Sequence, residues 1–210
     1  MYCPPLFRED RLENLHALIR SHPLGLLISC GPSGPTANLV PFVLQTGAGE
    51  RGVLQAHIAR ANPQWRGLEE QAVLVVFRGP DAYVSPSLYA TKQETGKVVP
   101  TWNYAMVQAR GRVKLREESD WLTKQLTALT SGRESQRLHP WAITDAPPDY
   151  IESQMKHIIG IEIEIAALEG KWKVSQNQPE ANRRSVAAEF SLDERTREMA
   201  ELVRLYGKLD

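Results

Sequence analysis

Side chains that could bind a ligand are unusually dense in two neighbouring segments, residues 83–92 and 98–104. These segments combine aromatic rings, hydroxyl groups, an amide and a lysine, while Pro86 and Pro100 constrain the backbone. A strand buried only for stability would be rich in Val, Ile and Leu. A flavin-like ring needs a flat apolar wall with donors at its rim, and its phosphate needs hydroxyls, a cation and free amides. The composition therefore favours a site for a planar, phosphorylated ligand; the alternative is a loop whose rings plug a barrel end.

A second candidate segment covers residues 56–65, where a predicted strand runs into the start of a short helix. Asn62 is a good helix N-cap and Pro63 stands at the favoured first helical position. The first turn of a helix leaves backbone amides unpaired, and Arg60 lies just before them, so this segment could hold a phosphate without a glycine-rich loop. The alternative is that Arg60 is solvated and Asn62 only caps its helix.

Composition limits the class of protein. Lys plus Arg and Asp plus Glu number 25 each, so no global charge attracts the chain to nucleic acid or to an anionic membrane. Cys3 and Cys30 are far apart and form no C-x-x-C motif, which suits a reducing compartment. No apolar run approaches the length of a membrane span, and no signal peptide is recognisable. These features predict a cytoplasmic protein without membrane contact.

The positions of the elements must bring the two candidate segments together. Periodicity and turn residues predict helices over residues 10–22, 63–70, 117–132 and 149–155, and strands over 24–30, 36–45, 53–59, 72–77, 98–115, 158–166 and 168–175. The strand over 72–77 is expected to stop at Gly79 and Pro80, and Gly111 is expected to mark a bulge or a close approach of two backbones. Short strands, Gly/Pro turns and flanking helices favour a small antiparallel barrel.

The C-terminal residues 179–210 are predicted to form a separate helical tail behind a domain spanning residues 1–178. Ser191 and Glu194 read as a capping box for the last helix, and Met199, Leu202, Val203 and Tyr206 form its apolar stripe. We expect this tail to pack on the barrel or on a second copy of the chain.

Common catalytic and nucleotide-binding motifs are not found. The chain has no G-x-G-x-x-G after a strand, no phosphate-binding lysine loop, no H-E-x-x-H and no nucleophile elbow. The five histidines are scattered without the spacing of metal ligands, so no metal site is predicted. No residue stands out as an essential acid or base, and catalytic residues are therefore not assigned.

Four blocks, residues 56–65, 79–92, 99–104 and 169–177, together resemble the PaiB family of FMN-binding split-barrel proteins, and the opening residues 1–4 match as well. The resemblance implies a six-stranded antiparallel split barrel, α+β but mainly β, with flanking helices. It also implies a homodimer with FMN at the subunit interface. The family is named for a bacterial negative transcriptional regulator.

Carried over by motif, the resemblance implies which residues contact FMN. The phosphate contacts would be Arg60, Ser85, Ser87 and Lys92, assisted by amides near Asn62. The ring and ribityl contacts would be His57, Tyr89, Thr101, Trp102 and Asn103. The second subunit would contribute Lys171, Lys173, Ser175, Gln176 and Asn177. Leu88 stands where the family commonly has Trp, and Gln178 where it often has Arg, which would weaken flavin binding.

Three functions remain open from the sequence. The first is a flavin-dependent oxidoreductase, since split barrels include enzymes in which FMN carries out the electron chemistry. The second is a regulator or sensor, which could act on DNA. DNA binding would need clustered cations, and residues 182–184 (Asn-Arg-Arg) offer only a thin patch among acids. Haem binding through a histidine is the third alternative.

Overall fold

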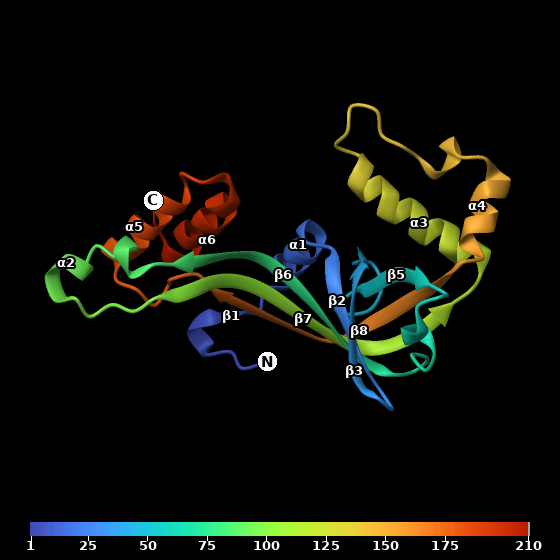
Figure 1. Cartoon of the computed structure of the whole chain (residues 1–210), viewed down its shortest axis with the longest axis horizontal. Coiled ribbons are helices and arrows are strands. Elements are labelled where there is room, and N and C mark those ends of the chain that lie inside the picture. The colour runs from blue at the N-terminus through green and yellow to red at the C-terminus, as the bar shows by residue number, and fades with distance from the viewer. Residues whose placement is uncertain (210) are drawn as a thin grey trace. The chain divides into compact units, whose positions relative to one another are not determined.

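The computed structural model describes residues 1–209 and consists of an antiparallel sheet with flanking helices (Figure 1). The strands are β1 (Arg8–Glu9), β2 (Leu24–Gly31), β3 (Gly34–Pro41), β4 (Val43–Gln45), β5 (Val53–Ala59), β6 (Ala72–Val84), β7 (Thr101–Arg116) and β8 (Ile158–Lys173). The α-helices are α1 (Leu12–Ser21), α2 (Lys92–Thr95), α3 (Ser119–Glu134), α4 (Pro148–Met155), α5 (Glu180–Phe190) and α6 (Arg197–Gly207). Short 3-10 helices are η1 (Pro5–Phe7), η2 (Pro63–Trp65), η3 (Pro86–Leu88), η4 (Ile143–Asp145) and η5 (Glu194–Thr196).

The strand order is β3-β2-β6-β7-β8-β5-β4, with β1 paired to β8. The pairs β2–β3, β2–β6, β4–β5, β5–β8 and β1–β8 are antiparallel. The predicted class, a mainly antiparallel sheet with helices at its sides, is confirmed. The six strands implied by the resemblance are too few, because the sheet of the described residues has eight, including the very short β1 and β4.

Several predicted boundaries are wrong. β6 does not stop at Gly79 but continues to Val84. Because β2 pairs with β6 only over Leu74–Val76, this later part of β6 lies beyond that partner, where a proline such as Pro80 is tolerated. The two strands predicted over 158–166 and 168–175 are one strand, β8. The short helix expected to run from Pro63 to residue 70 is only the three-residue η2.

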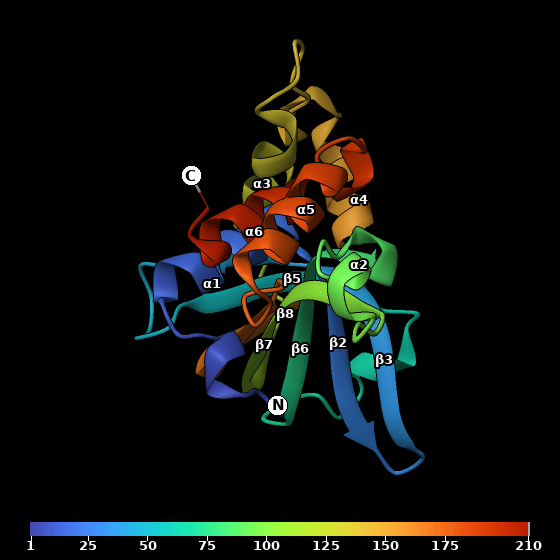
Figure 2. The same ribbon diagram turned by 90° about the vertical axis from the view of Figure 1, so that its left-hand side faces the viewer.

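The chain divides into two compact units, and the long strands β6, β7 and β8 contribute residues to both. One unit, here called the tail unit, contains Met1–Leu15, Arg78–Val107 and the residues from Glu169 onward. In it, α5 and α6 pack side by side on the strands, as Figure 2 also shows. Trp172 of β8 stacks on Tyr206 of α6 with ring centroids 6.3 Å apart. The C-terminal residues form α5, η5 and α6; Asp193 is the N-cap of η5, and α6 begins after Thr196 without a side-chain cap, so the predicted capping box of Ser191 and Glu194 is wrong.

The other unit, here called the barrel unit, contains His16–Phe77 and Gln108–Leu168. Its apolar core includes Leu27, Phe42, Leu54, Phe77, Ile159, Ile161 and Ile163, all nearly inaccessible to solvent. Phe42 and Phe77 meet edge to face with centroids 5.7 Å apart. Within residues 1–209, none of the helices is both long enough and apolar enough to span a bilayer.

Candidate functional site

The predicted ligand-binding residues fall into both units. Nine of them lie in the tail unit: Ser85, Ser87, Tyr89, Lys92, Thr101, Trp102, Asn103, Lys173 and Gln176. The other three, His57, Arg60 and Asn62, lie in the barrel unit. Each group is described by itself below.

Hydroxyl groups cluster directly after β6. Ser85 is the N-cap of η3, and its Oγ accepts a hydrogen bond from the Ser87 amide at 3.3 Å. The two serine hydroxyls are also 2.7 Å apart and hydrogen-bonded. Lys92 follows five residues after Ser87 as the first residue of α2, and it is exposed. This segment presents two hydroxyls and one ammonium group to solvent, which are groups that bind phosphate.

Tyr89 and Asn103 lie in the interior. Tyr89 is 3% exposed, and burial raises the pKa of its hydroxyl. That hydroxyl has no hydrogen-bond partner among the described residues. Asn103 is fully buried and donates from Nδ2 to the Ser175 hydroxyl at 2.9 Å. Asn103 therefore fixes the turn after β8 to the start of β7, and in this conformation neither side chain offers a surface to a ligand.

Thr101, Trp102 and Lys173 are in direct contact. The Lys173 ammonium donates to the Trp102 carbonyl oxygen at 2.6 Å and also to the Thr101 hydroxyl. The Trp102 ring is 54% exposed and meets the half-exposed ring of Tyr83 edge to face at 5.8 Å. Burial and the nearby charge of Lys171 lower the pKa of Lys173. The start of β7 and the end of β8 thus place an open aromatic surface beside a cation.

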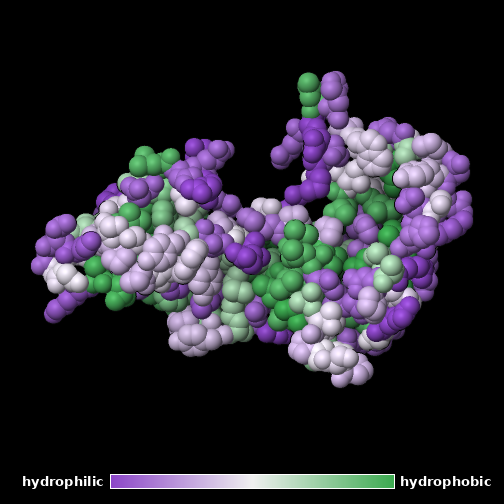
Figure 3. Space-filling model, in the orientation of Figure 1, coloured by the Kyte–Doolittle hydropathy of each residue, from purple (hydrophilic) through white to green (hydrophobic). Residues whose placement is uncertain are grey.

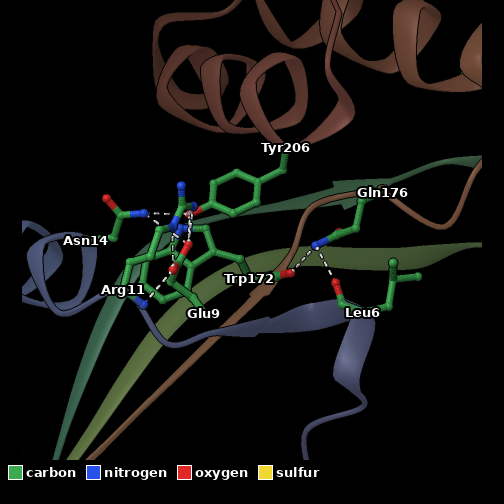
Figure 4. Close-up of polar contacts among 7 residues, drawn as sticks. All are labelled: Leu6, Glu9, Arg11, Asn14, Trp172, Gln176 and Tyr206. Carbon is green, nitrogen blue, oxygen red and sulfur yellow. Dashed lines mark hydrogen bonds and ion pairs between the residues drawn. The ribbon is translucent and has the colours of Figure 1, made fainter.

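Gln176 stabilises the turn that follows β8, as Figure 4 shows. Its side-chain oxygen accepts from the Val174 amide at 2.7 Å, and its side-chain nitrogen donates to the carbonyl oxygens of Trp172 and Leu6. The turn contains Ser175 at a φ of +66°, a conformation that non-glycine residues rarely adopt. Both polar atoms of the Gln176 side chain are engaged within the chain.

In the barrel unit, His57, Arg60 and Asn62 lie where β5 leads into η2. His57 Nδ1 is 2.8 Å from the side-chain oxygen of Gln125 on α3. Arg60 forms an ion pair with Glu117 at 2.6 Å. Asn62 accepts from the Gln64 amide at 3.0 Å, which confirms the predicted N-cap. Arg60 would have to exchange its carboxylate partner for a phosphate in order to bind one.

Asn62 also lines a polar pocket of about 560 Å³ between η2 and the β2–β3 turn. Gln64 holds this pocket together, because its side-chain nitrogen donates to the Ser29 hydroxyl at 3.0 Å and its oxygen accepts from Asn38 at 2.8 Å. Arg66 lies on the same wall. A larger cleft of about 940 Å³ is lined by β2, β6, β7 and β8 and contains none of the predicted residues.

The sequence did not identify two residues that contact predicted site residues, Tyr83 beside Trp102 and Gln125 beside His57. Tyr83 belongs to the segment that first drew attention, but it was not assigned a contact; its partner Trp102 lies across the two strands and could not be paired with it from spacing alone. Gln125 is 1% exposed, and its side-chain nitrogen is buried without a partner among the described residues. A polar residue on the apolar stripe of a predicted helix was the available signal for Gln125.

The donor set fits a flavin mononucleotide. The tail unit by itself offers aromatic rings, hydroxyls, the ammonium group of Lys173 and a second lysine, Lys92. Rings suit the isoalloxazine, and hydroxyls and cations suit the ribityl chain and the phosphate.

Comparison with known proteins agrees with this reading. The profile of the family described as "Putative FMN-binding domain" matches residues 1–167. The Bacillus subtilis protein named protease synthase and sporulation protein PAI 2 is 30% identical over 206 residues, covering 97% of this chain and 96% of that protein. An uncharacterized protein of Emericella nidulans is 38% identical over 226 residues, covering 90% of each chain.

Among solved structures, the flavocytochrome Anf3 from Azotobacter vinelandii superposes with a TM-score of 0.57 at 18% identity, covering 80% of this chain and 69% of that one. The FAD and heme binding protein from Mycobacterium smegmatis gives the same TM-score at 17% identity, with 79% and 73% coverage. At such low sequence identity, these two comparisons show that the fold is similar and nothing more. Fold and donor set together define a flavin-binding split-barrel protein.

The chain belongs to the PaiB family of FMN-binding proteins, as the family profile and the Bacillus relative show. Its cofactor is FMN.

Proposed function

We propose that this protein is a flavin-dependent sensor that acts as a negative transcriptional regulator. The main support is its similarity to the Bacillus sporulation protein over almost the whole of both chains.

In this proposal the protein regulates transcription by binding a partner protein, and α5 does not contact DNA. Arg183 donates to the Gly207 carbonyl oxygen at 2.7 Å, and Arg184 is paired with Glu180 at 2.8 Å. Asn182 is 2% exposed and donates to the Thr91 hydroxyl at 3.0 Å. The residues that made up the thin basic patch are thus engaged within the tail unit, which leaves little charge to displace counterions from a nucleic acid.

The test is a titration of dialysed protein with FMN, followed by addition of NADH or NADPH under anaerobic conditions. Tight binding of FMN, with an absorption spectrum that neither NADH nor NADPH bleaches, supports the sensor. Rapid bleaching would replace it by the alternative, an FMN-dependent oxidoreductase. A Soret band in the purified protein would instead indicate haem.

The phosphate assignment carries its own prediction. The double substitution Ser87→Ala with Lys92→Ala should lower FMN affinity by about 2 kcal/mol, roughly 30-fold, because charge-assisted hydrogen bonds to the phosphate would be lost. Riboflavin, which lacks the phosphate, should bind wild type and double mutant equally. The control is Lys97→Ala, an exposed lysine just after α2. An unchanged FMN titration of the double mutant would remove Ser87 and Lys92 from the phosphate site.

We also propose that the protein is a homodimer with FMN at the interface. The apolar outer face of β2 and β3 supports this: Leu24 is 54% exposed, Leu39 is 63% exposed, and Leu26 lies opposite Leu39 in the sheet. Apolar residues gather near the centre of Figure 3, where β2 and β6 run. Exposed apolar patches of this kind mark protein interfaces.

Accordingly, Leu24→Asp with Leu39→Asp should convert the dimer to monomer, because two carboxylates would be buried in an apolar contact. Light scattering after size-exclusion chromatography measures the mass. Leu138→Asp, at a residue 90% exposed outside this face, should leave the mass unchanged. Wild-type protein that elutes as a monomer with FMN bound would refute the shared site.

A further inference from the structure

The loop between β6 and β7, residues 85–100, carries Ser87 and Lys92, the two side chains proposed above as phosphate contacts. Hydrogen bonds among its own residues close its turns; the Tyr89 amide, for example, donates to the Pro86 carbonyl oxygen at 3.2 Å. Bonds of this local kind shape the turns, but they do not fix where the loop lies on the tail unit. A contact with a distant part of the chain is needed for that.

A buried asparagine of α5 supplies such a contact. Asn182 Oδ1 accepts a hydrogen bond from the Thr91 amide at 3.0 Å, and Asn182 Nδ2 donates to the Thr91 hydroxyl at 3.0 Å. The same nitrogen donates to the Gln178 side-chain oxygen at 3.3 Å, which engages both hydrogens of the amide group. The short helix η3 of the loop also lies against α5 (Figure 1). Two hydrogen bonds thus attach the loop to the helix.

The stability of α5 alone does not explain an asparagine at position 182. Asparagine is a weaker helix former than alanine or leucine. Asn182 is only 2% exposed, and burying an amide group costs free energy unless its hydrogen bonds are made within the protein. Thr91 makes two of these bonds, so the benefit of the asparagine lies in the attachment of the loop.

The helix α5 is in turn held to α6. Arg183 donates to the Gly207 carbonyl oxygen at 2.7 Å, and Arg204 of α6 donates to the hydroxyl of Ser191, the C-cap of α5, at 2.6 Å. The loop, α5 and α6 therefore form one connected set of contacts within the tail unit.

An attached loop has less conformational freedom to lose when a phosphate binds to it. If a ligand requires one conformation of a loop, its affinity falls with the fraction of molecules in which the loop adopts another. Hydrogen bonds that favour the binding conformation therefore raise the affinity. By thermodynamic reciprocity, the bound ligand stabilises the same hydrogen bonds.

We propose that Asn182 is a positioning residue for the phosphate of FMN. It holds Ser87 and Lys92 in place through Thr91, and FMN binding in turn stabilises the packing of α5 and α6. The inference rests on the proposed function and on the phosphate contacts assigned to Ser87 and Lys92; Asn182 acts through Thr91 and does not contact FMN. The helix pair is then the part of the chain whose stability depends on FMN, and a partner protein that binds this pair would detect the cofactor.

Titrations with FMN and with riboflavin test the positioning role. Asn182→Ala should lower FMN affinity about tenfold, as expected for the loss of two hydrogen bonds, and should leave riboflavin affinity unchanged because riboflavin has no phosphate. Thr91→Val removes one hydrogen bond without altering α5 and should lower FMN affinity about threefold, which keeps the test open if Asn182→Ala does not fold. The control is Arg184→Ala, an exposed residue of the same helix paired with Glu180, which should leave both affinities unchanged.

A double-mutant cycle tests whether Asn182 acts through the loop. In protein that already carries Ser87→Ala and Lys92→Ala, adding Asn182→Ala should not change FMN affinity further, because the loop no longer contacts the phosphate. A further loss of about tenfold in that background would overturn the proposal. Equal losses of FMN and riboflavin affinity in Asn182→Ala would also overturn it, since they would mean that Asn182 only stabilises the fold.

Hydrogen exchange tests the coupling to the helices. Saturating FMN should slow the exchange of α5 and α6 amides by about fivefold or more in the wild type, and this slowing should be lost in FMN-saturated Asn182→Ala. Saturating riboflavin is the control, because it stabilises the folded protein without reaching the phosphate contacts. Equal slowing by the two flavins would contradict the coupling.

Failure of this inference and failure of the proposed function give different results. If FMN does not protect α5 and α6 while NADH and NADPH leave the bound flavin unbleached, the coupling is overturned and the flavin sensor stands. If either nicotinamide bleaches the flavin while Asn182→Ala still lowers FMN affinity and the protection of α5, the sensor is overturned and the positioning role of Asn182 stands.

Discussion

Replacing Gly111 by alanine is expected to destabilise the protein by about 4 kcal/mol, at the upper end of what single substitutions do. A Cβ at this position would stand 2.1 Å from the carbonyl oxygen of Glu164 and 2.6 Å from the Ile163 side chain. The obstacle is mainly backbone, which cannot rotate away, so β7 and β8 would have to separate. Urea unfolding should show a lower midpoint, and the melting temperature should fall by roughly 10 °C.

The matched control is Gly132→Ala. Gly132 lies within α3, and a Cβ there would meet no atom within 4 Å. Alanine is the better helix former, so this variant should be unchanged or more stable by about 1 kcal/mol. A Gly111→Ala protein as stable as the wild type would mean that the two strands do not approach each other as described.

Replacing Glu9 by glutamine should produce the second large loss, about 2 kcal/mol at neutral pH, and a loss that depends on pH. Glu9 is 3% exposed, and Figure 4 shows its carboxylate at the centre of a cluster with Arg11, Asn14 and Tyr206. It accepts from Arg11 Nε at 2.8 Å, from Asn14 Nδ2 at 3.0 Å, and from the Tyr206 hydroxyl. A glutamine would present a donor to these donors.

The pH dependence follows from the pKa of Glu9. Burial raises the pKa of the carboxyl, but the hydrogen bonds from Arg11, Tyr206 and Asn14 outweigh burial and lower it to about 2 from its ordinary value of 4.5. Because the folded-state pKa is the lower one, the carboxylate stabilises the fold fully above about pH 4.5, and this stabilisation is lost as the pH falls towards 2.

The difference in unfolding free energy between wild type and Glu9→Gln should therefore be constant from pH 7 to pH 5 and should shrink between about pH 4.5 and pH 2. Urea unfolding at a series of pH values measures it. Glu13→Gln, which removes an exposed carboxylate in the first turn of α1, serves as the control and should cost much less stability at neutral pH. A difference that stays constant down to pH 2 would contradict the role given to the Glu9 carboxylate.

The sequence predicted elements well where periodicity was strong. The apolar pattern of residues 53–59 and the alternation of isoleucine with acid around residue 162 correspond to β5 and β8. Predictions failed where a residue that usually ends a strand or helix is accommodated in the folded sheet. Pro80 was expected to end a strand, yet β6 passes through it. Ser191 and Glu194 matched a capping box for the last helix, but Asp193 caps the short η5 before it by accepting from the Arg195 amide at 2.9 Å.

Residue type indicated a candidate site, but spacing did not show which of its residues lie together. Tyrosines, tryptophan, hydroxyls and lysines in residues 83–104 indicated a ligand surface, and Thr101, Trp102 and Lys173 are indeed in contact. Which polar groups are free to bind a ligand depends on partners far away in the chain. Arg60 is paired with Glu117, and Gln176 with backbone groups of residues 6, 172 and 174, and no short-range pattern reports this.

The Tyr89 hydroxyl and the Gln125 side-chain nitrogen, both buried without a partner among the described residues, have a thermodynamic consequence. An unsatisfied polar atom of this kind costs a folded chain about 1–3 kcal/mol. Phenylalanine or leucine would avoid that cost, so stability alone does not account for the residue types at these two places. Natural proteins stand only slightly above the stability they need, and a chain that forgoes several kcal/mol in its interior has correspondingly less tolerance for damage elsewhere.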